Sequence, residues 1–411
     1  MASSNGSYDA VIVGAGPGGA TAAAFMARAG LRVMLVDKAS FPRDKICGDA
    51  ISGKSVDVLR RLELIDQILT APQVKSWGID FGGPDGSVAS IPFTQELDRD
   101  IPPGFVCARE TYDQILFERA IEWGAEPRLQ TQVKQLIQED GVTRGVIVKG
   151  VDAEEEIRAP IVIGADGAYS VVARELGLEQ LDERYYSAGL RAYYRGVTGF
   201  NAHNHIELHF LSDALPGYFW IFPMANGMAN VGIGMLSSAI KRRDVKLKQL
   251  LAQCIEHPSF RDRFAEATPV GSVKGWGLPL GSRPRPMVGN GWMLVGDAAS
   301  LIDPFTGEGI GNAMVSGEIA ARYTIEASAQ RRFDAAFLAG YERDVRSYLG
   351  NELRISHALQ RLSGIRSLIG FVIRKAATSP QTAAAISCMF DDEQERRKLL
   401  RPSFYFKLLA S

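Results

Sequence analysis

The sequence predicts an α/β protein in which a parallel sheet with flanking helices is interleaved with an antiparallel sheet and followed by a C-terminal helical region. Three observations lead to this fold class. An apolar strand, a glycine-rich turn and a helix occupy residues 8–30. Two later apolar strands end in Asp-Gly or Gly-Asp, at 159–167 and 291–297. Between them, residues 185–280 consist of short β-rich runs separated by turn residues, which is typical of antiparallel strands.

The composition is that of an ordinary globular protein and excludes several function classes. The chain has 411 residues and a net charge of −1, which gives no overall attraction to nucleic acid. Its 4 cysteines are scattered, so no metal site or disulfide framework is expected. The N-terminal residues lack the basic and apolar regions of a signal peptide, and no apolar run is long enough to span a membrane. We therefore expect a cytoplasmic protein.

The first forty residues predict a dinucleotide-binding unit. Residues 8–13 are apolar and β-branched, as in a strand that is buried on both faces. Gly14 permits a tight turn, Gly16 lets the backbone approach a pyrophosphate, and Gly19 lets helix and strand pack closely. A second strand ends at Asp37, which is placed to bind a ribose hydroxyl. The order of these features indicates a Rossmann-like site but does not separate NAD from FAD.

Three later segments carry polar residues or glycines at the ends of predicted elements. They are Arg109, before a helix; Asp166 and Gly167, after an apolar strand; and Gly296 and Asp297, after another apolar strand. A glycine-rich loop then enters a helix near Gly309. The dipole of such a helix stabilises an anion at its N-terminus by ~0.3–2 kcal/mol, which suits a reduced flavin.

Together these segments resemble the flavoprotein group that contains aromatic hydroxylases, flavin-dependent halogenases and geranylgeranyl reductases. The resemblance covers about residues 7–320 and implies FAD as the cofactor. It implies FAD contacts at Gly14, Gly16, Pro17, Gly18, Gly19, Asp37, Lys38, Cys47, Gly48, Arg109, Val133, Asp166, Gly167, Gly296, Asp297, Pro304, Gly307, Gly309 and Ile310.

The middle of the chain contains an aromatic strand. In PGYFWIFP, residues 216–223, a period of two puts Tyr218, Trp220 and Phe222 on one face. Such a face is either part of a hydrophobic core or the wall of an apolar substrate cavity. The residues alone favour the core.

A closer resemblance favours the cavity. The aromatic strand with its following Gly-x-Gly is similar to the signature of geranylgeranyl reductases, in which it lines the site for a prenyl chain. The segments DPFTGEGI (303–310) and FPRDKICGD (41–49) are similar to that family as well. The resemblance implies a reductase that saturates isolated C=C bonds of a geranylgeranyl or polyprenyl group. It implies substrate contacts at Tyr218, Trp220, Phe222 and Gly232.

Two other function classes are kept as alternatives. A flavin-dependent halogenase or aromatic monooxygenase is the first, although halogenases resemble GWxWxIP where this chain has Tyr218 and Phe222. Halogenases also use a lysine, for which Lys75 is the candidate by position. A non-catalytic FAD-binding or electron-carrying protein is the second, and it is disfavoured because a carrier has little use for an aromatic-walled domain.

Cys47 follows the nucleotide-binding unit and has two interpretations. A free cysteine in a turn is most often a small buried filler. Saturation of an isolated alkene, however, needs an acid, and a thiol with a pKa of about 8.5 is mostly protonated at pH 7. In the family context we take Cys47 as the candidate proton donor. Tyr218 and Trp220 are the catalytic candidates whose ring faces stabilise developing positive charge.

The neighbours of Cys47 carry simpler expectations. Gly48 and Asp49 are expected to shape the loop, and Asp49 is also a candidate cap for the following helix. Arg43 and Lys45 are expected to be ordinary solvated charges.

These motifs divide the chain into three parts. The predicted FAD-binding domain is discontinuous and comprises 1–75, 105–180 and 280–330, whereas the predicted substrate domain comprises 76–104 and 181–279. Residues 331–411 are expected to form a helical region. It is either an amphipathic cap over the substrate domain or, through its basic and apolar residues, a peripheral membrane contact that admits a long-chain substrate. The sequence does not select the electron donor (NADPH, ferredoxin or similar), the head group of the lipid substrate, or the oligomeric state.

Overall fold

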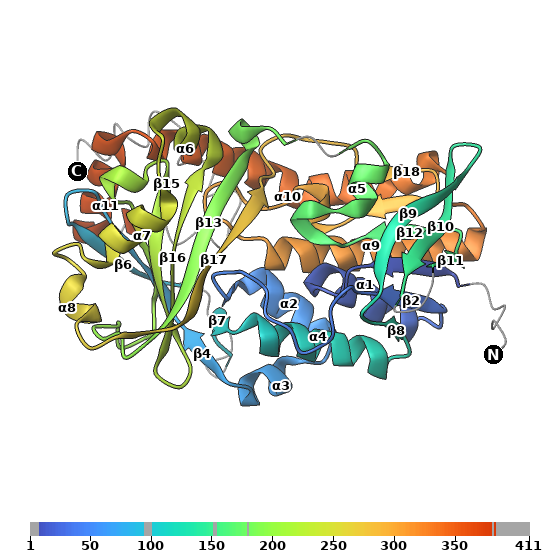
Figure 1. Cartoon of the computed structure of the whole chain (residues 1–411), viewed down its shortest axis with the longest axis horizontal. Helices are drawn as coiled ribbons and strands as arrows, with labels where there is room; N and C mark the ends of the chain where they lie inside the picture. Colours follow the sequence, from blue (N-terminus) through green and yellow to red (C-terminus); the bar gives the residue numbers. More distant parts are fainter. Residues whose placement is uncertain (1–7, 94–100, 151–153, 179–180, 380–381, 384–411) are drawn as a thin grey trace.

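The computed structural model of the chain describes residues 8–93, 101–150, 154–178, 181–379 and 382–383. It is an elongated molecule with the N-terminal nucleotide-type unit towards one end and a large twisted sheet at the other (Figure 1). The expected mixed α/β architecture is confirmed.

The predicted parallel sheet has six strands. Their order is β18 (Val288–Gly289), β19 (Trp292–Leu294), β12 (Val162–Gly164), β1 (Ala10–Val13), β2 (Val33–Val36) and β8 (Glu126–Arg128). All neighbours are parallel except β18 and β19. Strands β1 and β2 are buried throughout, which explains their unbroken apolar sequences.

Two helices cover this sheet and touch each other through glycines. Helix α1 (Pro17–Arg28) packs on α9 (Ile310–Gln330). A Cβ at Gly18 would lie 2.9 Å from the backbone oxygen of Ala313, and one at Gly317 would lie 2.2 Å from that of Gly18. This contact holds the two helix N-termini on one side of the sheet, where a dinucleotide would bind.

The second large sheet has seven strands. Their order is β17 (Thr268–Pro279), β13 (Tyr186–Arg195), β16 (Met228–Leu236), β15 (Gly217–Met224), β14 (Ile206–His209), β5 (Gly78–Gly82) and β6 (Val88–Pro92). The pairs are antiparallel, as expected, except for β14 with β5, which is parallel. The domain boundaries given above stay a prediction.

The aromatic strand β15 alternates between two faces, as predicted. Tyr218, Trp220 and Phe222 belong to a cluster that includes residues of the C-terminal helices. Phe219 and Ile221 point to the opposite face and pack against α7 (Leu247–Ile255) and α8 (Arg261–Phe264). The sheet is thus covered on both sides.

Smaller elements complete the fold. Two three-stranded sheets have the orders β11 (Glu154–Arg158), β10 (Val142–Lys149), β9 (Gln132–Glu139) and β3 (Ala50–Ile51), β7 (Gly104–Cys107), β4 (Gln73–Ser76). The remaining helices are α2 (Gly53–Arg61), α3 (Ile65–Thr70), α4 (Arg109–Glu122), α5 (Val171–Glu175), α6 (Ser237–Arg243), α10 (Ala335–Ser363) and α11 (Arg366–Thr378), with short 3₁₀ turns at Gly167–Tyr169, Glu183–Tyr185, Ser212–Ala214 and Gly296–Ala299.

The C-terminal region is helical where the structure describes it. Helix α10 reaches from β18 to α11, and α11 packs on β6 of the large sheet. The part of the predicted helical region at 384–411 lies outside the described residues. Among the described helices, none combines the length and apolar character needed to cross a membrane.

Candidate active site

The glycine-rich turn after β1 is shaped by close backbone contacts. Gly14 has a φ of +100°, and a Cβ at Gly19 would lie 1.8 Å from the Gly14 oxygen. The two carboxylate oxygens of Asp37 accept hydrogen bonds from the backbone N–H groups of Ala15 and Ala39, each at 2.8 Å. Asp37 therefore holds the turn in addition to its expected role at a ribose.

A cluster of two arginines and one buried aspartate lies beside this turn. Arg109 binds Asp113 through two hydrogen bonds of 2.7 Å, and Arg43 Nη1 lies 2.9 Å from Asp113 Oδ2. A Cβ on Gly16 would be 3.6 Å from Arg43 Nη2. The expectation that Arg43 is solvated is thus wrong. One carboxylate shared by two guanidinium groups leaves positive charge next to the N-terminus of α1, which suits a pyrophosphate.

The second predicted half of the cofactor site lies at the N-terminus of α9. A Cβ on Gly309 would be 3.2 Å from Oδ1 of Asp297, so the carboxylate faces the start of this helix. Burial raises the pKa of Asp297, while Lys45 and Arg109 lower it. Asp297 nevertheless keeps exposed surface, as a group that lines a ligand site would.

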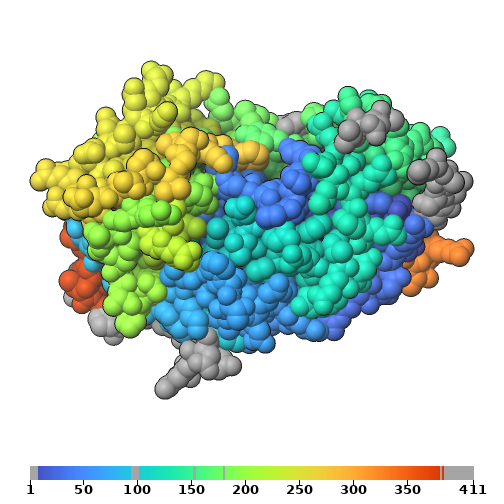
Figure 2. All heavy atoms as spheres, turned by 60° about the horizontal axis from the view of Figure 1, so that its bottom comes forward, coloured from blue at the N-terminus to red at the C-terminus, as the bar shows by residue number. Residues whose placement is uncertain are grey.

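Lys45 belongs to the same region. Its Nζ lies 3.7 Å from the centre of the Trp276 ring, and burial lowers its pKa to about 8 although Asp297 raises it. The expectation of an ordinary solvated lysine is therefore wrong. The loop that carries Lys45 comes to the surface between β17 and α4 (Figure 2), which agrees with the Trp276 contact and with the stacking of Phe41 on Phe117.

The other expected FAD contacts occupy varied positions. Asp166 accepts hydrogen bonds from Ser170 and from the backbone N–H groups of Val171 and Val172, so its carboxylate caps α5. Val133 is buried in β9 opposite Val148, and Lys38 is exposed. Contacts of these three residues with FAD stay a prediction.

These residues fit FAD. A tight turn, an arginine pair, and the N-termini of α1 and α9 offer the positive groups that a pyrophosphate and a flavin anion need. The residues that would hold the cofactor are Gly14, Gly16, Pro17, Gly18, Arg43, Arg109, Asp297, Gly309 and Ile310, with Cys47, Gly48, Gly296, Pro304 and Gly307 in the loops beside them.

The loop before α9 is tied to the aromatic strand. Oδ1 of buried Asp303 accepts hydrogen bonds from the backbone N–H groups of Phe305 and Thr306, at 2.9 and 2.8 Å. The backbone oxygen of Thr306 in turn accepts a hydrogen bond of 2.5 Å from the hydroxyl of Tyr218. Tyr218 thereby fixes the position of this loop, and its hydroxyl is oriented by that bond.

A charged cluster ties the same loop to the C-terminal helices. Nζ of Lys54 lies 3.3 Å from Glu308 and 2.5 Å from Glu352 of α10, and it donates to Asn312 of α9 at 2.8 Å. Their charged side chains are largely shielded from solvent. Sequence reasoning missed this cluster because its members are far apart along the chain.

Trp220 lies flat on the neighbouring strand. A Cβ at Gly232 would be 2.2 Å from Cζ2 of Trp220, and one at Gly234 would be 3.8 Å from Cζ3. The Gly-x-Gly pair therefore makes room for an indole. In the structure, Gly232 makes room for the indole of Trp220. Its contact with substrate stays a prediction.

The thiol-bearing loop meets the aromatic strand. A Cβ at Gly48 would lie 3.1 Å from Cε2 of Phe222, and the Cys47 backbone oxygen accepts a hydrogen bond of 2.8 Å from Asn230. Burial raises the pKa of the Cys47 thiol, although Arg109 beside it acts in the opposite direction. The thiol is therefore protonated at neutral pH.

Asp49 has a different role from the expected helix cap. It has a φ of +64° and is fully buried, and its Oδ2 accepts hydrogen bonds from Tyr193 at 2.7 Å and Asn230 at 2.8 Å. The residue at the N-cap of α2 is Ser52 instead. Burial raises the pKa of Asp49 to about 6, although Tyr193 and Asn230 lower it.

A pocket opens beside the aromatic strand. Its walls come from β15 and β16, from the loop before α9, and from α10. The lining includes Phe210, Tyr218, Leu278, Phe305, Gln360 and Ser363. The contribution of α10, through Gln360 and Ser363, agrees with the expected helical cap over this sheet.

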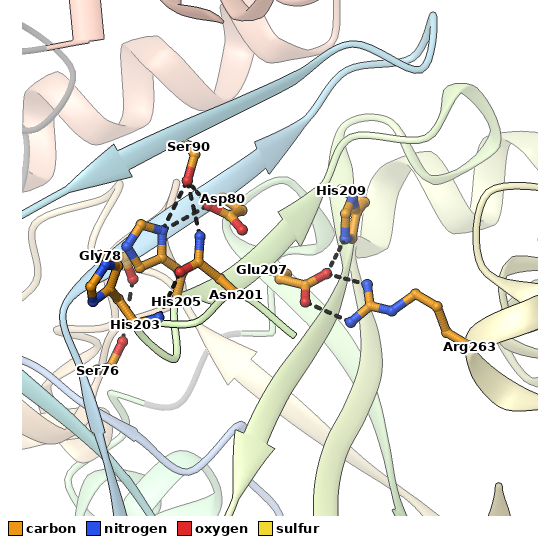
Figure 3. Close-up of polar contacts among 10 residues, drawn as sticks. All are labelled: Ser76, Gly78, Asp80, Ser90, Asn201, His203, His205, Glu207, His209 and Arg263. Atoms are coloured by element: carbon orange, nitrogen blue, oxygen red, sulfur yellow. Dashed lines mark hydrogen bonds and ion pairs between the residues drawn. The ribbon is translucent and has the colours of Figure 1, made fainter. Parts of the chain in front are cut away.

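A second group of polar residues lies on the large sheet, around strands β5, β6 and β14 (Figure 3). His205 Nδ1 is 2.8 Å from Asp80 and 3.1 Å from Ser90. A serine nucleophile needs the opposite ring nitrogen from the one that the aspartate binds, so this geometry is not that of a catalytic triad. Nearby, Glu207 binds Arg263 through bonds of 2.6 and 2.7 Å (Figure 3). Both groups join β14 to its neighbours.

Comparison with known proteins agrees with an FAD-binding oxidoreductase. A model of the FAD binding domain family matches residues 7–340. A menaquinone reductase of Mycobacterium tuberculosis is 34% identical over 77% of this chain and 76% of its own length. A digeranylgeranylglycerophospholipid reductase of Thermoplasma volcanium is 33% identical over 82% of this chain and 83% of its own.

Solved structures give the same grouping. A geranylgeranyl bacteriochlorophyll reductase-like protein of Thermoplasma acidophilum has a TM-score of 0.81 at 26% identity and covers 96% of this chain and 98% of its own. A flavin-dependent brominase has a TM-score of 0.78 at 22% identity, with 98% of this chain and 100% of its own covered, which shows a shared fold alone. The cofactor is FAD, and the chain belongs to the geranylgeranyl reductase family of FAD-dependent oxidoreductases.

Proposed function

We propose that this enzyme reduces isolated C=C bonds in a geranylgeranyl or other polyprenyl group of a lipid. The names of its relatives support this substrate class. The single observation that carries the proposal is the packing of Gly48 against Phe222, since it brings the thiol-bearing loop to the aromatic face of β15.

The chain's own residues supply the proton. When bound, FAD provides the hydride for one alkene carbon. Cys47 holds a proton at Sγ for the other carbon, because burial keeps its thiol protonated. Arg109 and the backbone N–H of Asp49 stabilise the thiolate that remains after the proton is donated.

The aromatic face provides the environment that this chemistry needs. Protonation of an isolated alkene gives a transition state with positive charge, which survives only where water is excluded. The rings of Tyr218 and Trp220 stabilise such charge by ~0.5–2 kcal/mol. Phe210 and Phe305 are stacked with their ring centroids 5.8 Å apart, and they extend the apolar wall towards α10.

The lipid substrate leads to a further part of the proposal. Helices α10 and α11 carry basic residues and lie beside the pocket and the large sheet, so we extend the proposal to peripheral contact with anionic lipid. Flotation of the full chain with anionic and with neutral vesicles tests this contact. Enrichment with anionic vesicles alone is expected, and equal flotation with both contradicts the contact.

Anaerobic reoxidation tests the reductase proposal. FAD-loaded protein is reduced with dithionite, and the flavin absorbance is followed after addition of a geranylgeranyl compound. Return of the oxidised spectrum is expected, with no return when the fully saturated phytanyl analogue is added. A flavin that stays reduced with both compounds contradicts the proposal, and halide-dependent chlorination of a phenol in air favours a halogenase.

A further inference from the structure

Asn230 occupies an unusual position for its residue type. It lies in β16, is fully buried, and faces Phe222 on the neighbouring strand β15. Asparagine is depleted in strands, and a buried amide is stabilising only when its polar atoms have partners. An apolar residue at this position would leave the partners of the amide unpaired. The partners of its amide therefore indicate what this asparagine does.

The side chain of Asn230 makes three hydrogen bonds. Nδ2 donates to the backbone oxygen of Cys47 and to Oδ2 of Asp49, each at 2.8 Å. Oδ1 accepts from Nε1 of Trp220 at 2.9 Å. One amide thus binds both ends of the Cys47–Asp49 loop and the nitrogen end of the indole.

The strand pattern around Asn230 matches this arrangement. Asn230, Gly232 and Gly234 lie on one face of β16, opposite Phe222, Trp220 and Tyr218 respectively. The two glycines leave room for the rings of Trp220, and the asparagine meets its N–H. The face of β16 therefore fixes both the plane of the indole and its rotation within that plane.

We propose that Asn230 is a positioning residue that sets Cys47 relative to Trp220. This inference rests on the proposed role of Cys47 as proton donor and of Trp220 as part of the substrate wall. A proton donor acts only when it lies within hydrogen-bond reach of the atom it protonates, so a small displacement of the loop slows the reaction. Asn230 lies 183 residues from Cys47 and 181 residues from Asp49 along the chain, and its amide joins their loop to the aromatic strand.

The central test compares Asn230→Ala with the wild type in a single turnover. Reduced protein is mixed with a saturating geranylgeranyl compound, and separately with O₂, which needs neither Cys47 nor the pocket. We expect reoxidation by the prenyl compound to slow 10- to 100-fold, with an unchanged dependence on its concentration and unchanged reoxidation by O₂. A purely structural role would lower the melting temperature but leave the rate of FAD-loaded molecules unchanged, and this result overturns the proposal.

Two readouts do not depend on the reaction. In Asn230→Ala, release of the loop should speed alkylation of Cys47 by iodoacetamide at least 5-fold, as mapped by mass spectrometry. The near-ultraviolet circular dichroism of the indole should also weaken. If Asn230→Ala leaves both unchanged, the proposal is wrong whatever the substrate is. If both change while wild-type protein ignores prenyl compounds, the proposed function fails and the positioning role stands.

Asn230→Asp gives a second, pH-dependent test. It keeps the shape and the acceptor for Trp220, but at high pH it cannot donate to Cys47. The charged or titratable groups around Asp49 are Tyr193, Arg191, Arg109, Cys47 and Cys107. A proton shared by two neighbouring carboxylates lies between them, so a donor for the Cys47 oxygen returns only when both acids are protonated at low pH. Single-turnover rates of this variant should recover towards wild type as the pH falls, and a rate that does not depend on pH contradicts the role. Should Asn230→Ala not fold, Trp220→Phe removes the bond from the indole N–H together with part of the ring and should release the loop to a smaller degree. Unchanged alkylation in that variant likewise overturns the proposal.

Discussion

The indole of Trp220 lies across Gly232 of the neighbouring strand so closely that a Cβ at Gly232 would fall 2.2 Å from Cζ2. This contact leaves no space for any side chain other than hydrogen. It determines where the aromatic wall stands relative to the Cys47 loop, because the same indole is hydrogen-bonded to Asn230.

Gly232→Ala should therefore displace the indole. Overpacking of this kind costs ~1–3 kcal/mol, measured as the free energy of unfolding in urea. Gly189→Ala in the adjacent strand β13 is the matched control, because its Cβ would meet atoms only at 3.7 Å or more. Equal stability of the two variants would show that Trp220 is not held as described.

Cys47→Ala should slow alkene reduction by at least ~10²-fold, the usual contribution of a general acid. The rate of flavin reduction by dithionite should not change, because that step needs no thiol. Cys254→Ala is the control, since Cys254 is buried with Leu250 and Phe260 on the other face of the sheet. Wild-type turnover in Cys47→Ala would remove the thiol from the mechanism.

Asp49→Asn should change the pH dependence of stability. The pKa of Asp49 is raised from 3.8 to about 6 in the folded chain, so its contribution to stability is fully present below about pH 4 and is lost as the pH rises through about 6. Two pKa units correspond to roughly 3 kcal/mol. Asparagine tolerates the positive φ, so the variant should match wild type near pH 4 and exceed it by ~1–3 kcal/mol at pH 8.

Asp80→Asn should have the opposite effect on the pH dependence of stability. Burial alone would raise the pKa of Asp80, but hydrogen bonds from His205 and Ser90 hold it below its ordinary value. The contribution of Asp80 to the free energy of unfolding is present at pH values above its ordinary pKa and is lost in acid. Asp80→Asn should therefore be less stable than wild type at pH 8. Urea denaturation of both variants at the two pH values checks both signs, and two shifts of the same sign would contradict the assignment.

Lys54→Met should weaken FAD binding. The substitution leaves Glu308 and Glu352 without the ammonium group between them, and their repulsion would move the loop that precedes α9. We expect the dissociation constant of FAD to rise about 10-fold, measured by fluorescence titration of apoprotein, which corresponds to about 1.4 kcal/mol. Exposed Lys246→Met is the control. Equal FAD affinity in the two variants would show that this cluster does not influence the cofactor site.

The sequence was sufficient for the parts of the site that depend on local pattern. The strand, glycine turn and helix at the N-terminus, and the alternation of Tyr218, Trp220 and Phe222, follow from periodicities of 3.6 and 2. Both are found where they were expected.

The parts that sequence reasoning missed are contacts between distant elements. Asn230 and Cys47 are 183 residues apart, and Lys54 and Glu352 are 298 apart. No periodicity records such a pairing, so Arg43 and Lys45 also looked like surface charges. A signal for Asn230 was present, however: it is the only polar side chain in the run NVGIGML.

The central claim is that this enzyme saturates isolated double bonds of a prenyl chain with a proton from Cys47. The most direct measurement is the mass of a geranylgeranyl compound after incubation with dithionite-reduced, FAD-loaded protein, for the wild type and for Cys47→Ala. Steps of +2 Da in the wild-type product, with little or none from the variant, are the expected result. An unchanged mass with wild-type protein would contradict the reductase function, and equal steps with both proteins would contradict the role of Cys47.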